Sequence, residues 1–279
     1  MALARSLGIV SRDLLPHDKG RYLLNGVKLF DMGLTLGADG VEVGELSPAT
    51  DFLSVSGRSG YVDNTLTDEL DTGFIQSRTL TIHLITSGLE SDANTSKMSI
   101  SRLAGSSIRF RDLMLPGEWR GRVTSVEWTD VRNLIGCYVH SEGTMQVEAQ
   151  PFLIGSTLRV PAFTESTTVR IDGNKPVYPR LHITVNQTLE TPITVKCSNG
   201  LEPDPDTTRV LSCVAQDGNW VQGQTLDIDM DTMGSTVGTM PYYGVSLDSD
   251  FWRLYPGMQT IEATSGVTVA LDYEPEWSI

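Results

Sequence analysis

Hydrophobic and polar residues alternate over short segments of this chain, and glycine-containing turns separate the segments. The alternation is strictest over residues 79–84, where Leu80, Ile82 and Leu84 are separated by polar side chains. A period of two places every second side chain on one face of the backbone, which is typical of a half-buried β-strand. The chain from residue 23 to residue 84 therefore predicts a scaffold of sheets rather than a pocket built for chemistry.

A tight turn is expected earlier in the same region of the chain. Residues 52–61 contain Gly57 and Gly60 in a Gly-x-x-Gly sequence, and Tyr61 follows directly. Glycine reaches backbone conformations that other residues avoid, so this spacing predicts a strand that ends in a turn.

The second half of the chain contains further strand signals, separated by turn sequences such as Asp172-Gly173 and Asp217-Gly218. Short, evenly spaced strands with turns between them favour a β-sandwich. The fold class predicted from the whole pattern is all-β. The strands expected in this half are Leu181–Val185, Ile193–Cys197, Arg209–Ala215, Thr225–Asp231 and Thr268–Tyr273.

Helical patterns are scarce. The best candidate is Ser96–Ala104, which shows no β alternation and has Asn94 or Thr95 in position to cap its first turn. A second, shorter helix is expected at Ser6–Leu15, because Pro16 would end it.

A domain boundary is expected just after Phe152. Pro151 and Gly155 interrupt the pattern there, and strand alternation restarts at Thr157–Val160. A chain of 279 residues is long enough for two ordinary domains. We therefore predict one domain over residues 1–153 and a second over residues 154–279.

The charge and the cysteines exclude several classes of protein. A formal net charge of −14 argues against specific binding of nucleic acid, which requires clustered lysine and arginine. Cys137, Cys197 and Cys213 have no CxxC spacing, so they are interpreted as reduced, small hydrophobic residues in strands. No apolar run approaches the length of a membrane helix, and the first residues lack the pattern of a secretory signal, so neither membrane insertion nor secretion is expected.

One string of carboxylates has the spacing of a metal site. Asp227, Asp229 and Asp231 alternate as at the start of an EF-hand loop, but Thr232 and Gly238 occupy the positions that need glycine and glutamate. The favoured interpretation is a strand whose aspartates face water. No metal or other cofactor is predicted.

No catalytic site is predicted either. The four histidines, at positions 17, 83, 140 and 182, are far apart, and none has an HxH or HExxH spacing. His83 and His182 lie within strand alternation and are interpreted as solvated or locally hydrogen-bonded sheet residues. A GxSxG elbow, a catalytic-cysteine context and a phosphate-binding loop are all absent from the sequence.

The aromatic residues of the second half leave an alternative open. Sandwich domains that bind sugars present tryptophan and tyrosine faces to the rings, and the candidates here are Trp220, Tyr242, Tyr243 and Trp252. We favour packing of these side chains in the core or at an interface.

Several motifs together resemble one family. An Asn-Gly pair precedes an apolar strand, the Val-x-Gly-x-x-Gly turn is followed by an aromatic residue, and an arginine opens the Thr/Ile strand. The set resembles, in the expected order, the distal tail proteins of siphoviruses, the phages with long non-contractile tails. The other matching segments are Gly117–Val126, Met145–Phe152, Gly173–Val185 and Leu254–Trp277.

The resemblance implies a fold and an assembly. The fold would be an N-terminal β-sandwich with one helix, followed by a galectin-like, carbohydrate-binding-module-like β-sandwich. The assembly would be a homohexameric ring at the tail tip of the virion, formed by the N-terminal domains, with DNA passing through its lumen. Its neighbours would be the tail tube protein and the tail-tip hub protein, and the tape measure and receptor-binding proteins are further candidates.

The residues expected to shape the ring domain are Gly57, Arg58, Gly60 and Tyr61 in the turn, and Arg78 at the start of the next strand. A place for them in the contact between subunits is a further expectation. Two alternatives to a non-enzymatic connector remain: a module of the tail tip that binds host saccharides through the second domain, and a tail-tip enzyme such as a cell-wall hydrolase.

Overall fold

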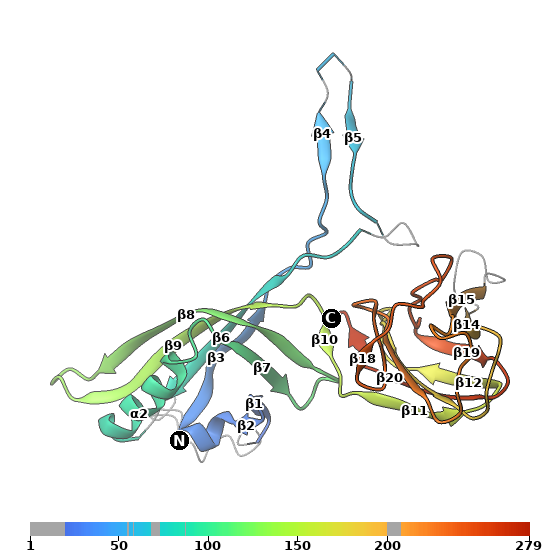
Figure 1. Cartoon of the computed structure of the whole chain (residues 1–279). Coiled ribbons are helices and arrows are strands. Elements are labelled where there is room, and N and C mark those ends of the chain that lie inside the picture. The colour runs from blue at the N-terminus through green and yellow to red at the C-terminus, as the bar shows by residue number, and fades with distance from the viewer. Residues whose placement is uncertain (1–19, 55, 58, 68–72, 87, 200–207) are drawn as a thin grey trace. The chain divides into compact units, whose positions relative to one another are not determined.

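The structure, a computed structural model, is mainly β (Figure 1). It describes residues 20–54, 56–57, 59–67, 73–86, 88–199 and 208–279. The helix expected at Ser6–Leu15 and the side chain of Arg58 lie outside these ranges. Contacts divide the chain into two units, Met1–Leu153 and Ile154–Ile279. Each unit is described below by itself.

Unit 1 consists of an antiparallel sheet, a short two-stranded hairpin and helices. Its main sheet has the strand order β2-β1-β7-β8-β9-β6-β3, and β4 pairs only with β5. The elements are β1 (Tyr22–Leu24), β2 (Val27–Lys28), the 3₁₀-helix η2 (Leu29–Met32), β3 (Leu34–Val43), β4 (Phe52–Ser54), β5 (Tyr61–Asp63), β6 (Arg78–Thr86), α2 (Glu90–Ser101), β7 (Ser107–Asp112), β8 (Glu118–Arg132) and β9 (Tyr138–Ala149), with β10 (Leu153–Ile154) at the junction of the units.

The core of unit 1 lies between its sheet and α2. Strand β6 buries every second residue, as its alternation predicts, and Leu80 and Ile82 are fully buried. Phe110 of β7 and Met145 of β9 are buried as well, and α2 adds Ile100. Burial of large apolar side chains from sheet and helix stabilises this arrangement.

Helix α2 confirms that a helix lies in this region, but the expected start is wrong. The helix begins at Glu90, six residues before Ser96, and its N-cap is Leu89 in an extended conformation. The two expected capping residues lie inside the helix, where the Thr95 hydroxyl donates a 3.1 Å hydrogen bond to the Ser91 carbonyl. The start of the helix could not be predicted from the sequence, because leucine is a poor N-cap residue and does not mark a helix N-terminus.

Unit 2 is a sandwich of two antiparallel sheets. One sheet has the order β11-β20-β13-β16-β17-β18, and the other has the order β12-β19-β14-β15. The elements are β11 (Leu158–Phe163), β12 (Ser166–Ile171), β13 (Arg180–Val185), β14 (Ile193–Asn199), β15 (Thr208–Cys213), β16 (Thr225–Asp229), β17 (Gly234–Val237), β18 (Met240–Pro241), β19 (Gly257–Ala263), β20 (Val267–Tyr273) and β21 (Glu276–Trp277).

The inward faces of both sheets form one core. Leu181 and Leu271 come from the larger sheet, and Val195 and Ile261 come from the smaller one; all four are at most 1% exposed. Trp252, in the segment between β18 and β19, is completely buried in the same core. Alternating side chains on facing sheets build this packing, so a mainly β fold is confirmed.

The carboxylate string follows the strand interpretation as far as Asp229, where β16 ends, and Asp231 lies in the turn that follows. Leu226, Ile228 and Met230 are buried, as expected for one face of a strand. On the other face Asp227 accepts a 2.6 Å hydrogen bond from His182, and Asp229 accepts one of 3.1 Å from Arg180. Partners from the neighbouring strand therefore occupy these carboxylates.

The cysteines follow the expectation in two of three places. Cys197 and Cys213 are buried in strands, whereas Cys137 is exposed in the loop between β8 and β9. Over the parts of the chain that the structure describes, no helix is long and apolar enough to cross a membrane.

Candidate assembly surfaces

Between β3 and β6 the chain makes a long excursion, residues 44–77, which we call the arm. Its two branches stay hydrogen-bonded to each other: Ala49 N–H donates to the Phe74 carbonyl at 2.7 Å, and Gln76 N–H donates to the Ser47 carbonyl at 2.9 Å. The β4–β5 hairpin forms the far part of the arm (Figure 1). None of the described arm residues is buried.

The hairpin carries large apolar side chains on its surface. The rings of Phe52 and Tyr61 pack against each other with centroids 4.5 Å apart, yet they are 52% and 61% exposed. Leu53 is 54% exposed. The two glycines of the expected turn, Gly57 and Gly60, have φ of 83° and 90° and lie between β4 and β5, so the turn has the predicted place.

The described residues of the arm form no core of their own. A two-stranded hairpin is marginally stable in water unless its apolar face packs on something else. Large exposed apolar patches of this kind mark interaction surfaces. The arm can therefore hold its conformation and hide its apolar side chains by packing on another molecule.

Arg78 lies at the base of the arm and not at its exposed end. It is 6% exposed, its guanidinium carbon is 4.8 Å from the centre of the Trp119 ring, and Nη1 donates a 3.2 Å hydrogen bond to the Pro151 carbonyl. Stacking and hydrogen bonding of this buried cation fix the start of β6 against the sheet. Its contacts within unit 1 are structural.

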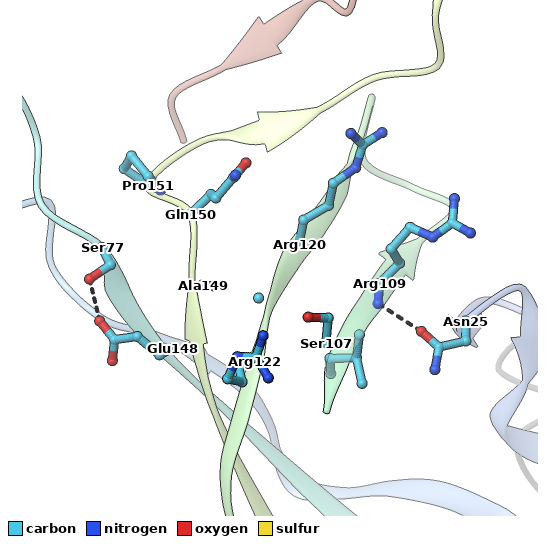
Figure 2. A pocket seen from close by; sticks show the side chains of 12 residues that line it. Asn25, Ser77, Ser107, Arg109, Arg120, Arg122, Glu148, Ala149, Gln150 and Pro151 are labelled. Atoms are coloured by element: carbon cyan, nitrogen blue, oxygen red, sulfur yellow. Dashed lines mark hydrogen bonds between the residues drawn. The ribbon is translucent and has the colours of Figure 1, made fainter. Parts of the chain in front are cut away.

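A second surface feature is a groove of about 620 Å³ across β7, β8 and β9, which Figure 2 shows. Three of its lining residues are Arg109, Arg120 and Arg122, and we call it the arginine groove. Asn25 and Glu148 lie at its sides, where the Asn25 side chain accepts a 2.8 Å hydrogen bond from the Arg109 backbone N–H. None of these arginines was among the site residues predicted from the sequence.

The four candidate saccharide-facing aromatics do not form one surface. Trp220, Tyr242 and Trp252 are buried at 2%, 3% and 0% exposure, and the Tyr242 hydroxyl donates a 2.7 Å hydrogen bond to the Val214 carbonyl. Burial raises the pKa of Tyr242, as expected for a hydroxyl in the core. Tyr243 alone of the four is exposed, at 83%.

The comparisons with known proteins begin with a family model. The C-terminal domain of the siphovirus-type tail components matches residues 172–277. The matched residues lie within unit 2, which is similar to that family's domain. No curated protein sequence matches the chain.

The fold of the chain is also similar to that of a solved structure. The SPP1 Dit (gp 19.1) protein, described as a paradigm of the hub adsorption apparatus in phages that infect Gram-positive bacteria, matches with a TM-score of 0.66 and 17% identity. The match covers 92% of this chain and 98% of that one. The match shows that the chain has a fold similar to that of this protein.

Two chains from structures of the phage P2 baseplate in its activated conformation also match. The structure with Ca has 11% identity and a TM-score of 0.36, covering 83% of this chain and 90% of that one. The structure with Sr has 10% identity and a TM-score of 0.39, covering 90% and 97%. At these TM-scores the two matches add nothing to the assignment of the fold.

Proposed function

We propose that this tail component is a non-enzymatic connector at the tail tip of the virion. Unit 1 of each copy joins a homohexameric ring between the tail tube and the tail-tip hub. Unit 2 carries or contacts the adhesion components. The family model and the Dit fold support a hub or baseplate role, and surface fit rather than bond making is the mechanism.

The observation that carries the proposal is the arm. A closed ring repeats one heterologous contact, in which a surface of one copy fits a different surface of the next. An arm without a core of its own, with Phe52, Leu53 and Tyr61 exposed, supplies one half of such a contact. For a permanent particle this contact is expected to be large and apolar.

The mass of the purified full chain in solution tests the ring. Multi-angle light scattering at increasing protein concentration is expected to reach six times the 30.5 kDa of one chain. A chain that stays monomeric both alone and with the purified tube and hub proteins would contradict the proposal.

Two substitutions in the hairpin test the role of the arm. Phe52→Ser with Tyr61→Ser removes apolar area that is exposed in the single chain, so the folded chain is expected to keep its stability within about 1 kcal/mol while the ring dissociates at least tenfold more readily. A matched control is Tyr243→Ser with Leu247→Ser, two exposed residues of unit 2. If the ring is equally stable in the hairpin variant and in the control variant, the arm does not take part in the contact between subunits.

A further inference from the structure

The arginine groove contains an unfavourable pairing of like charges. Arg109 of β7 and Arg120 of β8 are directly opposite each other in the antiparallel register, and Arg122 follows two residues along β8. Directly opposed like charges destabilise a strand pair. Local choices that cost stability are expected where a site needs them for function.

Glu118 lies beside two of these arginines, and Arg122 Nη1 donates a 2.5 Å hydrogen bond to the Gly105 carbonyl. Arg120 donates a 3.0 Å hydrogen bond from Nε to Glu118 Oε1, whereas the nearest Arg109 nitrogen is 3.9 Å from the same oxygen. Glu148 accepts a hydrogen bond from the Ser77 hydroxyl on the far side of the groove. Arg109 is 64% exposed, so its guanidinium can bind a further anion.

Strand β8 lies very close to β9 beside the groove. A Cβ at Gly121, between the two arginines of β8, would collide with the backbone of Glu148 and Ala149, so only glycine fits here without moving β9. Figure 2 shows the side chains of Arg109 and Arg120 extending from adjacent strands, with Gln150 on the side of β9. Arg109 and Arg120 therefore present their guanidinium groups on the same face of the sheet.

We propose that the arginine groove binds an extended, acidic segment of a partner protein. Arg109 and Arg122 are diagonal neighbours on adjacent strands, so they are separated by about 7–8 Å across the sheet. Alternate carboxylates of an extended peptide have a similar separation. Arginine forks bind carboxylates through paired hydrogen bonds, and Asn25 and Gln150 at the sides add amide groups for the peptide backbone.

Charge favours a short acidic segment over a long polyanion. The chain has a formal net charge of −14, which repels nucleic acid at long range. A short peptide with a few carboxylates is attracted by Arg109 and Arg122 at close range. Because it carries few charges, the net negative charge of the chain repels it only weakly. The inference concerns the partner of this groove, and it does not require the ring.

Binding of a labelled alternating Glu-Ser peptide to the full chain tests the inference. Fluorescence anisotropy at low salt is expected to show saturable binding that weakens as salt is added. Arg109→Gln with Arg122→Gln is expected to weaken binding roughly tenfold, through loss of two partly exposed charge pairs. Arg109→Lys with Arg122→Lys keeps the charge, removes the planar forks and should bind with intermediate affinity.

The matched control is Arg159→Gln with Arg170→Gln, which makes the same change of charge on unit 2 and is expected to leave binding unchanged. Equal weakening in both glutamine variants would reduce the effect to net charge and overturn the inference. Tighter binding of duplex DNA than of the peptide would overturn it in favour of a phosphate site. Absence of peptide binding would also overturn the inference. If the groove variants instead change only the mass of the assembly, the occupant of the groove is a second copy of the chain, and the inference fails in that case too.

Discussion

At the scale of single residues, Arg78 shows how a conspicuous sequence position can have a local role. Its guanidinium stacks on Trp119 and donates to the Pro151 carbonyl, and its exposure of 6% leaves little of it for a partner. A buried charge is costly unless it is hydrogen-bonded, so the position requires a residue with fixed donors. The proposed subunit contact consequently depends on Tyr61 and its neighbours on the hairpin and not on Arg78.

Asp112 makes stability depend on pH. The Arg21 guanidinium donates hydrogen bonds of 2.8 Å and 2.7 Å to its two oxygens and holds the pKa of this carboxyl below its ordinary value of 3.8, against a smaller opposing effect of burial. Because the folded pKa is depressed, the stabilisation is complete above the unfolded-state pKa and is lost as the pH falls through the folded pKa.

Asp112→Asn is therefore expected to reduce the free energy of unfolding at pH 7 by no more than about 1 kcal/mol, since Arg21 is partly exposed and solvent screens the pair. The difference from the unmodified chain should shrink below pH 4 and vanish at the lowest pH at which the chain stays folded. Urea unfolding at several pH values measures it. Arg21→Gln removes the same pair and should give a similar profile, and a difference that stays constant with pH would contradict the assignment.

At the scale of elements, the strands were predictable and the ends of the helix were not. Strand β6 could be predicted because one of its faces is buried and the other is in contact with solvent. Hydrophobic and polar residues therefore alternate in its sequence with a period of two. Helix α2 buries only Ala93, Ser96 and Ile100, so its apolar stripe is thin. Its first turn was missed because neither composition nor a capping residue marks it.

The two candidate assembly surfaces were predictable from the sequence only in part. The glycines of the arm signalled a turn, because positive φ favours glycine. The length of the arm and its exposure depend on which distant segments pack against it. A local pattern of hydrophobic and polar residues does not contain that information. The arginine groove depends on the register of β7 against β8, and the only signal in the sequence was arginine at alternate positions, 109 with 111 and 120 with 122.

The missing cap of α2 can be supplied. Leu89 has the extended backbone of an N-cap, with φ of −69° and ψ of 148°, but no side-chain cap, and it is 72% exposed. Leu89→Ser is expected to raise the free energy of unfolding by about 1 kcal/mol, because the hydroxyl accepts a hydrogen bond from a free N–H of the first turn. Leu89→Ala provides the control without a cap and should bring no gain. Thermal unfolding of the unmodified chain, Leu89→Ser and Leu89→Ala measures the effect. Equal melting temperatures would show that the missing N-cap of α2 does not limit stability.

At the scale of the whole molecule, each unit has its own means of stability. The core cluster of unit 2 draws on residues from Val160 to Tyr273, and both of its sheets are completed within the unit. Unit 1 combines a helix-covered sheet with an arm that buries none of its described residues. Stability of the single chain and stability of an assembly are therefore expected to depend on different residues.

This separation predicts that residues 154–279 fold alone. A domain of this size can bury enough apolar surface for independent stability, and Trp252 in its core reports on native packing. The isolated segment is expected to unfold in one cooperative transition in urea, with the change in tryptophan fluorescence coinciding with the loss of β circular dichroism. Trp252→Ala in this segment should cost about 3–5 kcal/mol, because it leaves a cavity at a site with 0% exposure. A segment that binds hydrophobic dyes and melts without cooperativity would show that the core of unit 2 is insufficient by itself, and the two-unit description of stability would fail with it.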